Sequence, residues 1–260
     1  MNTKRRNVLA VLGALAVAST FAVPALAQVA EVKEKPPMYT YVSNWIIPRA
    51  RWAEMDKAGA AESKIMDKAL SSGSLVGYGD DLNLVHQPEN STHDSWWSSM
   101  SMAGLLNALE EIYKTGSPTS PVLSSATKHW DNIYVSRFYN WHSGVAHGAY
   151  THGASYKLKA DAPDDAVKTL SKNFIAPMLD KLVADGTLVE YEVDVEAVHT
   201  EDPGKFWIIY ITANAEGVDK VSAALRDTLK ASPFAGPAFS SMVDFTPHRD
   251  SLARTNATYK

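Results

Sequence analysis

The sequence of 260 residues contains no cysteine. Disulfides, thiol nucleophiles and cysteine-ligated zinc sites are therefore excluded. The P-loop and the motifs G-x-G-x-x-G, G-x-S-x-G and H-E-x-x-H are also missing, so the common signatures of nucleotide binding, serine hydrolysis and zinc proteolysis are absent. Without disulfides the fold must be stabilised by apolar burial, which a chain of this length can supply.

Long apolar runs are missing except for one, from Val8 to Val23. It follows the basic stretch Lys4–Arg6 and precedes the small-residue pattern Ala25–Ala27, as in a cleaved secretory signal. A transmembrane anchor is the alternative, but the run is short for a bilayer and is followed by Pro24. The sequence therefore predicts a signal peptide over residues 1–27, a flexible segment over 28–37 and a periplasmic or secreted mature protein. The pair Arg5-Arg6 leaves the twin-arginine route open beside the general secretory route.

Positive charge is scarce in the mature chain. Removal of Lys4, Arg5 and Arg6 leaves 22 basic residues against 29 acidic ones, a net charge of −7. Such a balance argues against a nucleic-acid partner.

One segment of the sequence occurs twice. Residues 65–86 read IMDKALSSGSLVGYGDDLNLVH and residues 178–199 read MLDKLVADGTLVEYEVDVEAVH, with nine identities at a constant offset of 113. Average composition would give about one or two identities by chance. The chain is therefore predicted to contain two copies of one unit.

Each copy shows the same order of elements. The first reads as a strand at 39–47, a helix at 49–70, strands at 75–86 and 96–99, a helix at 102–114 and a strand at 130–139. The second reads as a strand at 155–160, a helix at about 162–185, strands at 187–199 and 206–213, a helix at about 218–229 and a strand at 242–246. This β-α-β-β-α-β order is the ferredoxin-like plan. We expect unit 1 over 38–142, a Gly/His-rich linker over 143–153, unit 2 over 154–248 and a C-terminal tail over 249–260.

With this element order and the repeated G-[ST]-L-V-x-Y-x-x-D-x-x-x-V-H pattern, the chain resembles the dimeric α/β-barrel superfamily over Tyr39 to about His248. The resemblance implies an α+β fold in which two tandem ferredoxin-like units close sheet to sheet into a barrel, here as a monomer with an internal pseudo-twofold axis. Members of the superfamily include small-molecule monooxygenases, isomerases and haem-handling enzymes, so the resemblance implies no single activity or cofactor.

Strand alternation suggests which polar side chains face the barrel interior. Gly77, Gly79, Asp81 and Asn83 share one face of the first copy, and Glu190, Glu192, Asp194 and Glu196 share the corresponding face of the second. Asp81 and Asp194 would be related by the pseudo-twofold axis. They could hold a cation or divide acid and base roles; alternatively, the strand lies at an edge and its acids are solvated.

Histidines form a second candidate cluster. His142, His147 and His152 recur every five residues in the expected linker. Imidazoles bind metals and carry protons near neutral pH, which makes all three weak metal candidates and His142 a catalytic candidate beside Asp81 and Asp194. The alternative is a flexible linker that happens to contain histidines.

Aromatic residues concentrate in the first copy and at its exit. Trp45, Trp97, Tyr134 and Trp141 are candidates to line a pocket for a planar ligand such as a quinone, an aromatic acid or a haem edge. The alternative is that they only pack in the core. Two functions follow: an exported protein that binds or transforms a small molecule between the two units, or an exported non-enzymatic scaffold that binds a partner.

Export makes a direct prediction about the mature N-terminus. Cleavage after Ala27 should yield a chain that begins at Gln28, and mass spectrometry of the protein from the cell envelope or medium measures this. A mature protein that retains Met1 would contradict the signal-peptide interpretation.

Overall fold

The computed structural model describes residues 32–86 and 90–260; the predicted signal peptide lies outside them. The first half comprises β1 (Met38–Ile46), a 3-10 turn (Arg49–Glu54), α1 (Met55–Ser72), β2 (Gly77–Asn83), β3 (His93–Ser99), α2 (Met102–Thr115) and β4 (Lys128–Trp141). The second half comprises β5 (Gly144–Leu158), α3 (Ala166–Leu170), a π-helical turn (Ser171–Ile175), α4 (Ala176–Ala184), β6 (Leu188–Glu196), β7 (Lys205–Thr212), α5 (Ala215–Ala231), α6 (Ala235–Met242) and β8 (Val243–Tyr259).

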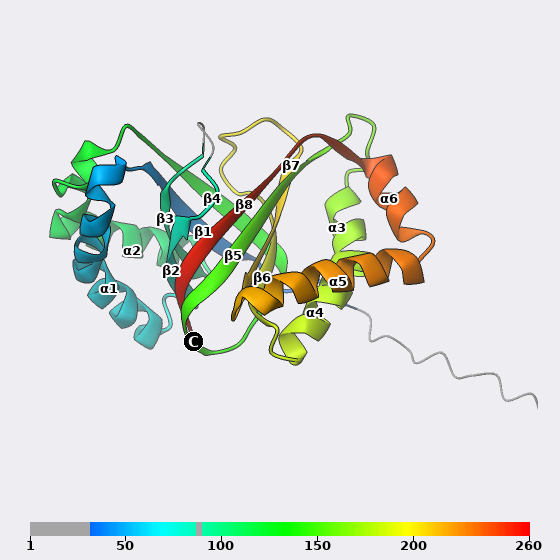
Figure 1. Cartoon of the computed structure of the whole chain (residues 1–260), viewed down its shortest axis with the longest axis horizontal. Helices are drawn as coiled ribbons and strands as arrows, with labels where there is room; N and C mark the ends of the chain where they lie inside the picture. The colour runs from blue at the N-terminus through cyan, green and yellow to red at the C-terminus, as the bar shows by residue number, and fades with distance from the viewer. Residues whose placement is uncertain (1–31, 87–89) are drawn as a thin grey trace, which may run out of the picture. The chain divides into compact units, whose positions relative to one another are not determined.

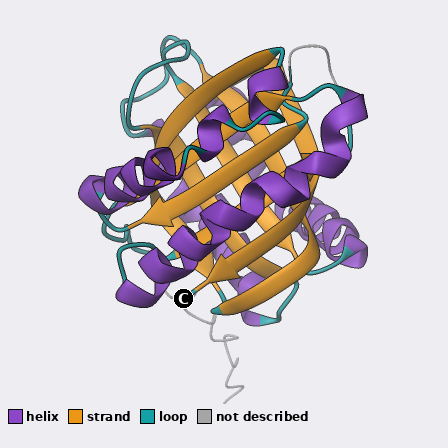
Figure 2. Cartoon of the chain, turned by 90° about the vertical axis from the view of Figure 1, so that its left-hand side faces the viewer, coloured by secondary structure: helices purple, strands orange, loops and turns teal. Residues whose placement is uncertain are grey.

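The strands form a closed antiparallel barrel in the order β1-β3-β2-β8-β5-β7-β6-β4, with β4 paired back to β1. Each half supplies four adjacent strands, in the orders β4-β1-β3-β2 and β8-β5-β7-β6. The halves meet at two seams, β2 with β8 and β4 with β6. Helices α1 and α2 cover one side of the barrel and α3–α6 cover the other (Figures 1 and 2). The predicted α+β class and the barrel are thus confirmed.

The sequence repeat corresponds to a structural repeat in the two central hairpins. Asp81 pairs with Asp94 between β2 and β3, and 113 positions later Asp194 pairs with Trp207 between β6 and β7. The helix that follows each hairpin also begins alike. Ser101 and Asn214 cap α2 and α5, and each side chain accepts a hydrogen bond of 3.0 Å from the backbone of the glycine three residues on.

Two predictions about chain organisation were wrong. The segment expected to be a linker, 143–153, lies almost entirely in β5, and the expected C-terminal tail, 249–260, belongs to β8. These two long strands pair with each other from Gly144–Tyr259 to Leu158–Val243. Gly148 adopts φ 63° at the bulge between His147 and Ala149. This glycine therefore allows an irregularity within a strand.

The helical layer of the second half is also more broken than expected. The helix predicted over about 162–185 is divided into α3, a π-helical turn and α4, and α6 was not predicted. Beneath these helices lies an apolar core that includes Leu170, Leu179, Tyr191 and Phe206. A smaller core beneath α1 and α2 includes Leu75, Trp97 and Leu105.

The β2–β8 seam depends on a glycine. A Cβ atom at Gly79 would lie 2.6 Å from the backbone oxygen of Asn256 on β8 and 2.5 Å from Cζ2 of Trp96. Gly79→Ala should therefore lower the free energy of unfolding by about 1 to 3 kcal/mol, as overpacking does. Gly236→Ala in α6 is the matched control, because its Cβ would meet no atom within 4 Å. Chemical denaturation measures both; equal stability of the two variants would contradict the close approach at this seam.

Candidate functional site

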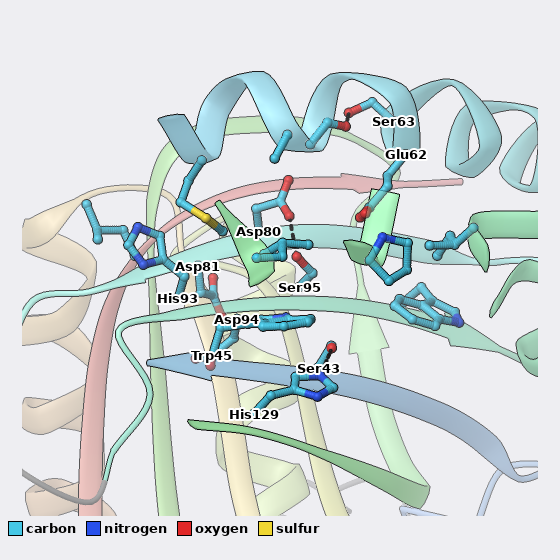
Figure 3. Close-up of a pocket in the computed structure, with 18 of the residues that line it drawn as sticks. Ser43, Trp45, Glu62, Ser63, Asp80, Asp81, His93, Asp94, Ser95 and His129 are labelled. Carbon is cyan, nitrogen blue, oxygen red and sulfur yellow. Dashed lines mark hydrogen bonds between the residues drawn. The ribbon is translucent and has the colours of Figure 1, made fainter. Parts of the chain in front are cut away.

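A cavity of about 900 Å³ lies in the first half, between the outer face of the sheet and helices α1 and α2. We call it the interlayer cavity. Its sheet wall carries Trp45, His93 and His129, and α1 contributes Glu62 on the opposite wall (Figure 3). Trp97 of β3 also lines it. The cavity thus combines flat aromatic surfaces with ionisable groups.

The structural repeat shows why this space is open. Outward positions of β3 and their counterparts in β7 are His93 and Phe206, Ser95 and Ile208, and Trp97 and Tyr210. In the second half Phe206 is fully buried and Ile208 packs against the same core. The first half has a polar or smaller side chain at two of these three positions, His93 and Ser95. The space between its sheet and its helices is therefore left open. The sequence repeat did contain a signal for this site. When the two copies are aligned, a polar residue of the first copy corresponds to an apolar residue of the second.

On the sheet wall, a chain of polar contacts surrounds His129. Its ring stacks on Trp45 with centroids 3.7 Å apart. His129 Nε2 lies 3.1 Å from Ser43 Oγ and 3.1 Å from Asp131 Oδ1. The imidazole is therefore held flat against an indole and beside a carboxylate.

Near the helix wall, the carboxyl groups of Glu62 and Asp80 lie close enough to interact electrostatically. Ser117 Oγ donates a hydrogen bond to Glu62 Oε1, and Ser95 Oγ donates one of 2.9 Å to Asp80 Oδ1. Burial raises the pKa of Glu62, the bond from Ser117 opposes that rise, and the nearby Asp80 adds to it. Glu62 can therefore hold a proton to higher pH than an exposed glutamate.

A second cavity, of about 310 Å³, lies inside the barrel. We call it the barrel cavity. Asp81, Glu190 and Glu192 line it. Asp81 Oδ1 accepts hydrogen bonds from Thr255 and, at 3.1 Å, from Thr151, and Glu192 Oε2 accepts one of 2.9 Å from Thr40.

The structure places both predicted aspartates in the barrel interior. Asp81 is 8% exposed and Asp194 is 0% exposed, so the alternative of a solvated edge strand was wrong. The third catalytic candidate is not with them: His142 is exposed beyond the end of β4, its Nε2 2.5 Å from the carbonyl oxygen of Val183. The strands bring the two acids inward and leave the histidine outside.

The predicted ligand-binding aromatics occupy three places. Trp45 and Trp97 line the interlayer cavity, whereas Tyr134 lines the barrel cavity. Trp141 packs against an interior cluster of the barrel, and its Nε1 donates a hydrogen bond of 3.0 Å to the carbonyl of Lys260. The four side chains therefore do not form one pocket.

The three histidines of the expected linker do not converge. His147 is exposed on β5, and His152 stacks on Tyr210 outside the barrel, with its Nε2 3.6 Å from Asp250 Oδ1. Across residues 32–86 and 90–260, no group of three or more His, Asp or Glu side chains is arranged to hold a metal ion. The same part of the chain contains no helix long and apolar enough to cross a membrane.

Buried acids should give the protein an unusual dependence of stability on pH. Burial raises the pKa of Asp81 to about 7 and that of Asp94 to about 6. Both groups bind a proton more tightly in the folded chain, so their contribution to stability is complete below about pH 4 and is lost as pH rises through about 7. At about 1.4 kcal/mol per pKa unit, ionisation of Asp81 alone should lower the free energy of unfolding by an amount on the order of 2 kcal/mol between pH 5 and pH 8.

Urea denaturation of the intact protein and of Asp81→Asn at both pH values measures this cost. We expect the variant to gain stability relative to the intact protein as pH rises. A constant difference between them would contradict the raised pKa of Asp81.

Comparisons with known proteins support the fold. No family model matches the sequence, and no curated protein matches it. Among solved structures, a "putative monooxygenase" from Lactobacillus acidophilus has a TM-score of 0.61 at 10% identity, with 86% of this chain and 97% of that chain covered. One from Fusobacterium nucleatum has a TM-score of 0.53 at 6% identity, covering 87% and 95%. A "putative chlorite dismutase" has a TM-score of 0.50 at 13% identity, covering 84% and 94%. The chain therefore has the dimeric α/β-barrel fold, with the whole barrel in one polypeptide.

Proposed function

We propose that this chain transforms a small planar molecule in the interlayer cavity. The contrast between its two halves carries the proposal: the same hairpin is packed with Phe206 and Ile208 in one half and faces an open cavity in the other. Loss of side-chain volume from a core lowers the stability of the fold. Binding of a ligand in the space would give that loss a function. A cavity supports this function over the scaffold alternative, although the proposed site lies in the first half and not between the two units, where the sequence had placed the pocket.

Flat surfaces in the cavity favour a planar ligand. Tyr41 and Trp97 stack at 4.4 Å with 12° between their planes, and Trp45 stacks with His129. All four line the cavity, whose volume of about 900 Å³ suits a drug-sized molecule. An aromatic compound could stack on either pair while its polar substituent reaches the ionisable groups.

The ionisable groups suit proton transfer. His129 is held beside Asp131 on the sheet wall, and Glu62 retains a proton more readily than usual on the helix wall. We assign His129 the role of base toward an acidic hydroxyl or C–H group of the ligand, and Glu62 that of acid. The names of two structural neighbours make oxidation by molecular oxygen of a hydroxylated aromatic compound the first reaction to test.

We also interpret the barrel as two tandem ferredoxin-like units in one exported monomer. Support comes from the matching strand orders of the two halves and from the shared register of their central hairpins. The barrel closes within one chain, so no second copy is needed to cover the inner sheet faces. Export rests on the N-terminal sequence alone.

The decisive variant gives the first half the side chains of the second. Asp80→Val with Ser95→Ile introduces the residues found at Val193 and Ile208. We expect this double variant to lose at least about tenfold in affinity for probes such as 2-naphthol and naphthoquinone, an energy of about 1.4 kcal/mol. Quenching of tryptophan fluorescence measures binding of both probes, and oxygen consumption with 2-naphthol measures turnover.

Thr151→Val, in the barrel cavity, is the control and should bind these probes normally. Glu62→Gln should lower turnover more than affinity if Glu62 acts as an acid. Unchanged binding in the Asp80→Val, Ser95→Ile variant, with circular dichroism showing an intact fold, would contradict the proposal.

A further inference from the structure

The barrel cavity contains carboxyl groups that the interlayer site does not use. Glu190 and Glu192 project into it from β6, and Asp81 projects from β2 on another side of the barrel. Among the residues that the structure describes, no ion pair reaches any of these three carboxyl groups. Lys205 and Arg249 also line the cavity, but Lys205 Nζ lies 2.5 Å from Glu201 Oε2, and the exposed Arg249 donates a hydrogen bond to the backbone of His248.

Hydrogen bonding inside the cavity is incomplete. Glu190 is 2% exposed, and its Oε1 has no hydrogen-bond partner. The same holds for Oδ1 of Asp94, which also lines the cavity. A buried polar atom without a partner costs about 1 to 3 kcal/mol, and more when it is charged. A ligand that brought N–H donors or positive charge would remove that cost.

The remaining walls are aromatic. Trp96 and Tyr259 lie with ring centroids 5.7 Å apart, and Tyr134 and Trp207 lie 4.7 Å apart. All four rings line the cavity. Aromatic faces attract cations through their ring quadrupoles, and the attraction is strongest where water is excluded. Aromatic rings together with carboxyl groups that form no ion pair within the described residues therefore favour an organic cation over an anion or a neutral ligand.

Size narrows the class of ligand. A volume of about 310 Å³ is at the lower limit for small-molecule sites. A bare metal ion fits less well, because in the described part of the chain the acids are not arranged as a metal-binding group. We propose that the barrel cavity is a second binding site, distinct from the interlayer cavity, that takes a small organic ammonium ion.

The two cavities are separated by a single layer of strand. Asp80 on β2 faces the interlayer cavity, where it accepts a hydrogen bond from Ser95, and the next residue, Asp81, turns inward to Thr151 and Thr255. Asp81 and Asp94 line both cavities, but Asp80→Val with Ser95→Ile leaves every acid and every aromatic ring of the barrel cavity in place. This lets the second site be tested independently of the proposed function.

Choline and its uncharged carbon isostere, dimethylbutanol, are the matched probes. Isothermal titration of the intact chain should show choline binding with a Kd of about 1 mM or tighter and the isostere at least about tenfold weaker. Glu190→Gln with Glu192→Gln should weaken choline binding at least about tenfold. Glu111→Gln, the same chemical change on the exposed surface of α2, should leave it unchanged.

Trp207→Leu provides a second route, because it removes an aromatic wall and leaves every acid in place. It should also weaken choline binding. The Asp80→Val, Ser95→Ile variant of the interlayer cavity should bind choline as the intact chain does. Equal binding of choline and its isostere, no binding of choline up to about 50 mM, or full affinity in the Glu190→Gln, Glu192→Gln variant would overturn the proposal.

Discussion

Closure of the sheet is the constraint on which the other features depend. Because β2 pairs with β8 and β4 pairs with β6, no strand of the barrel is left as an edge. Inward side chains in the middle of the barrel are then largely removed from water, whatever their polarity. Asp81, Glu190, Glu192 and Asp194 are buried for this reason, and burial is the largest cause of the raised pKa of each. Closure also requires small residues where strands approach closely, as at Gly79.

The outer faces of the barrel differ between the two halves: one is covered by a packed apolar core and the other lines a cavity. In the second half, apolar residues from β6, from β7 and from the helices fill the space beneath α3–α6 and form a large buried cluster. In the first half the corresponding space is lined by His93, Ser95 and Asp80 and remains open. One half thus stabilises the barrel while the other is free to hold a ligand. This division is consistent with the tendency of functional sites to depart from the best local packing.

Local patterns in the sequence were enough to predict the inward acids. Strand alternation around Asp81 and Asp194 specified a face, and the glycines after α1 and α4, Gly73 and Gly186, adopt the left-handed conformation that ends a helix. The long β5–β8 pair was missed because Gly144, Gly148 and Gly153 resemble a linker, and only tertiary pairing shows that they lie in a strand. The C-terminal residues did carry a signal, since Ala253, Thr255, Ala257 and Tyr259 alternate and all are buried. The interlayer cavity could not be located from either copy alone, because it depends on volume that a helix layer leaves unfilled.

Placing β8 between β2 and β5 has a consequence for the order in which the chain can fold. The last strand supplies pairing partners to both neighbours, and the bond between Asp81 and Thr255 joins residues 174 positions apart. Contacts of such long sequence separation form late, because a large loop must first be ordered. During synthesis β2 and β5 therefore remain unpaired along one side until residues 243–259 leave the ribosome or emerge from a translocation pore. A chaperone that protects exposed strand edges would therefore act on this chain until β8 has emerged.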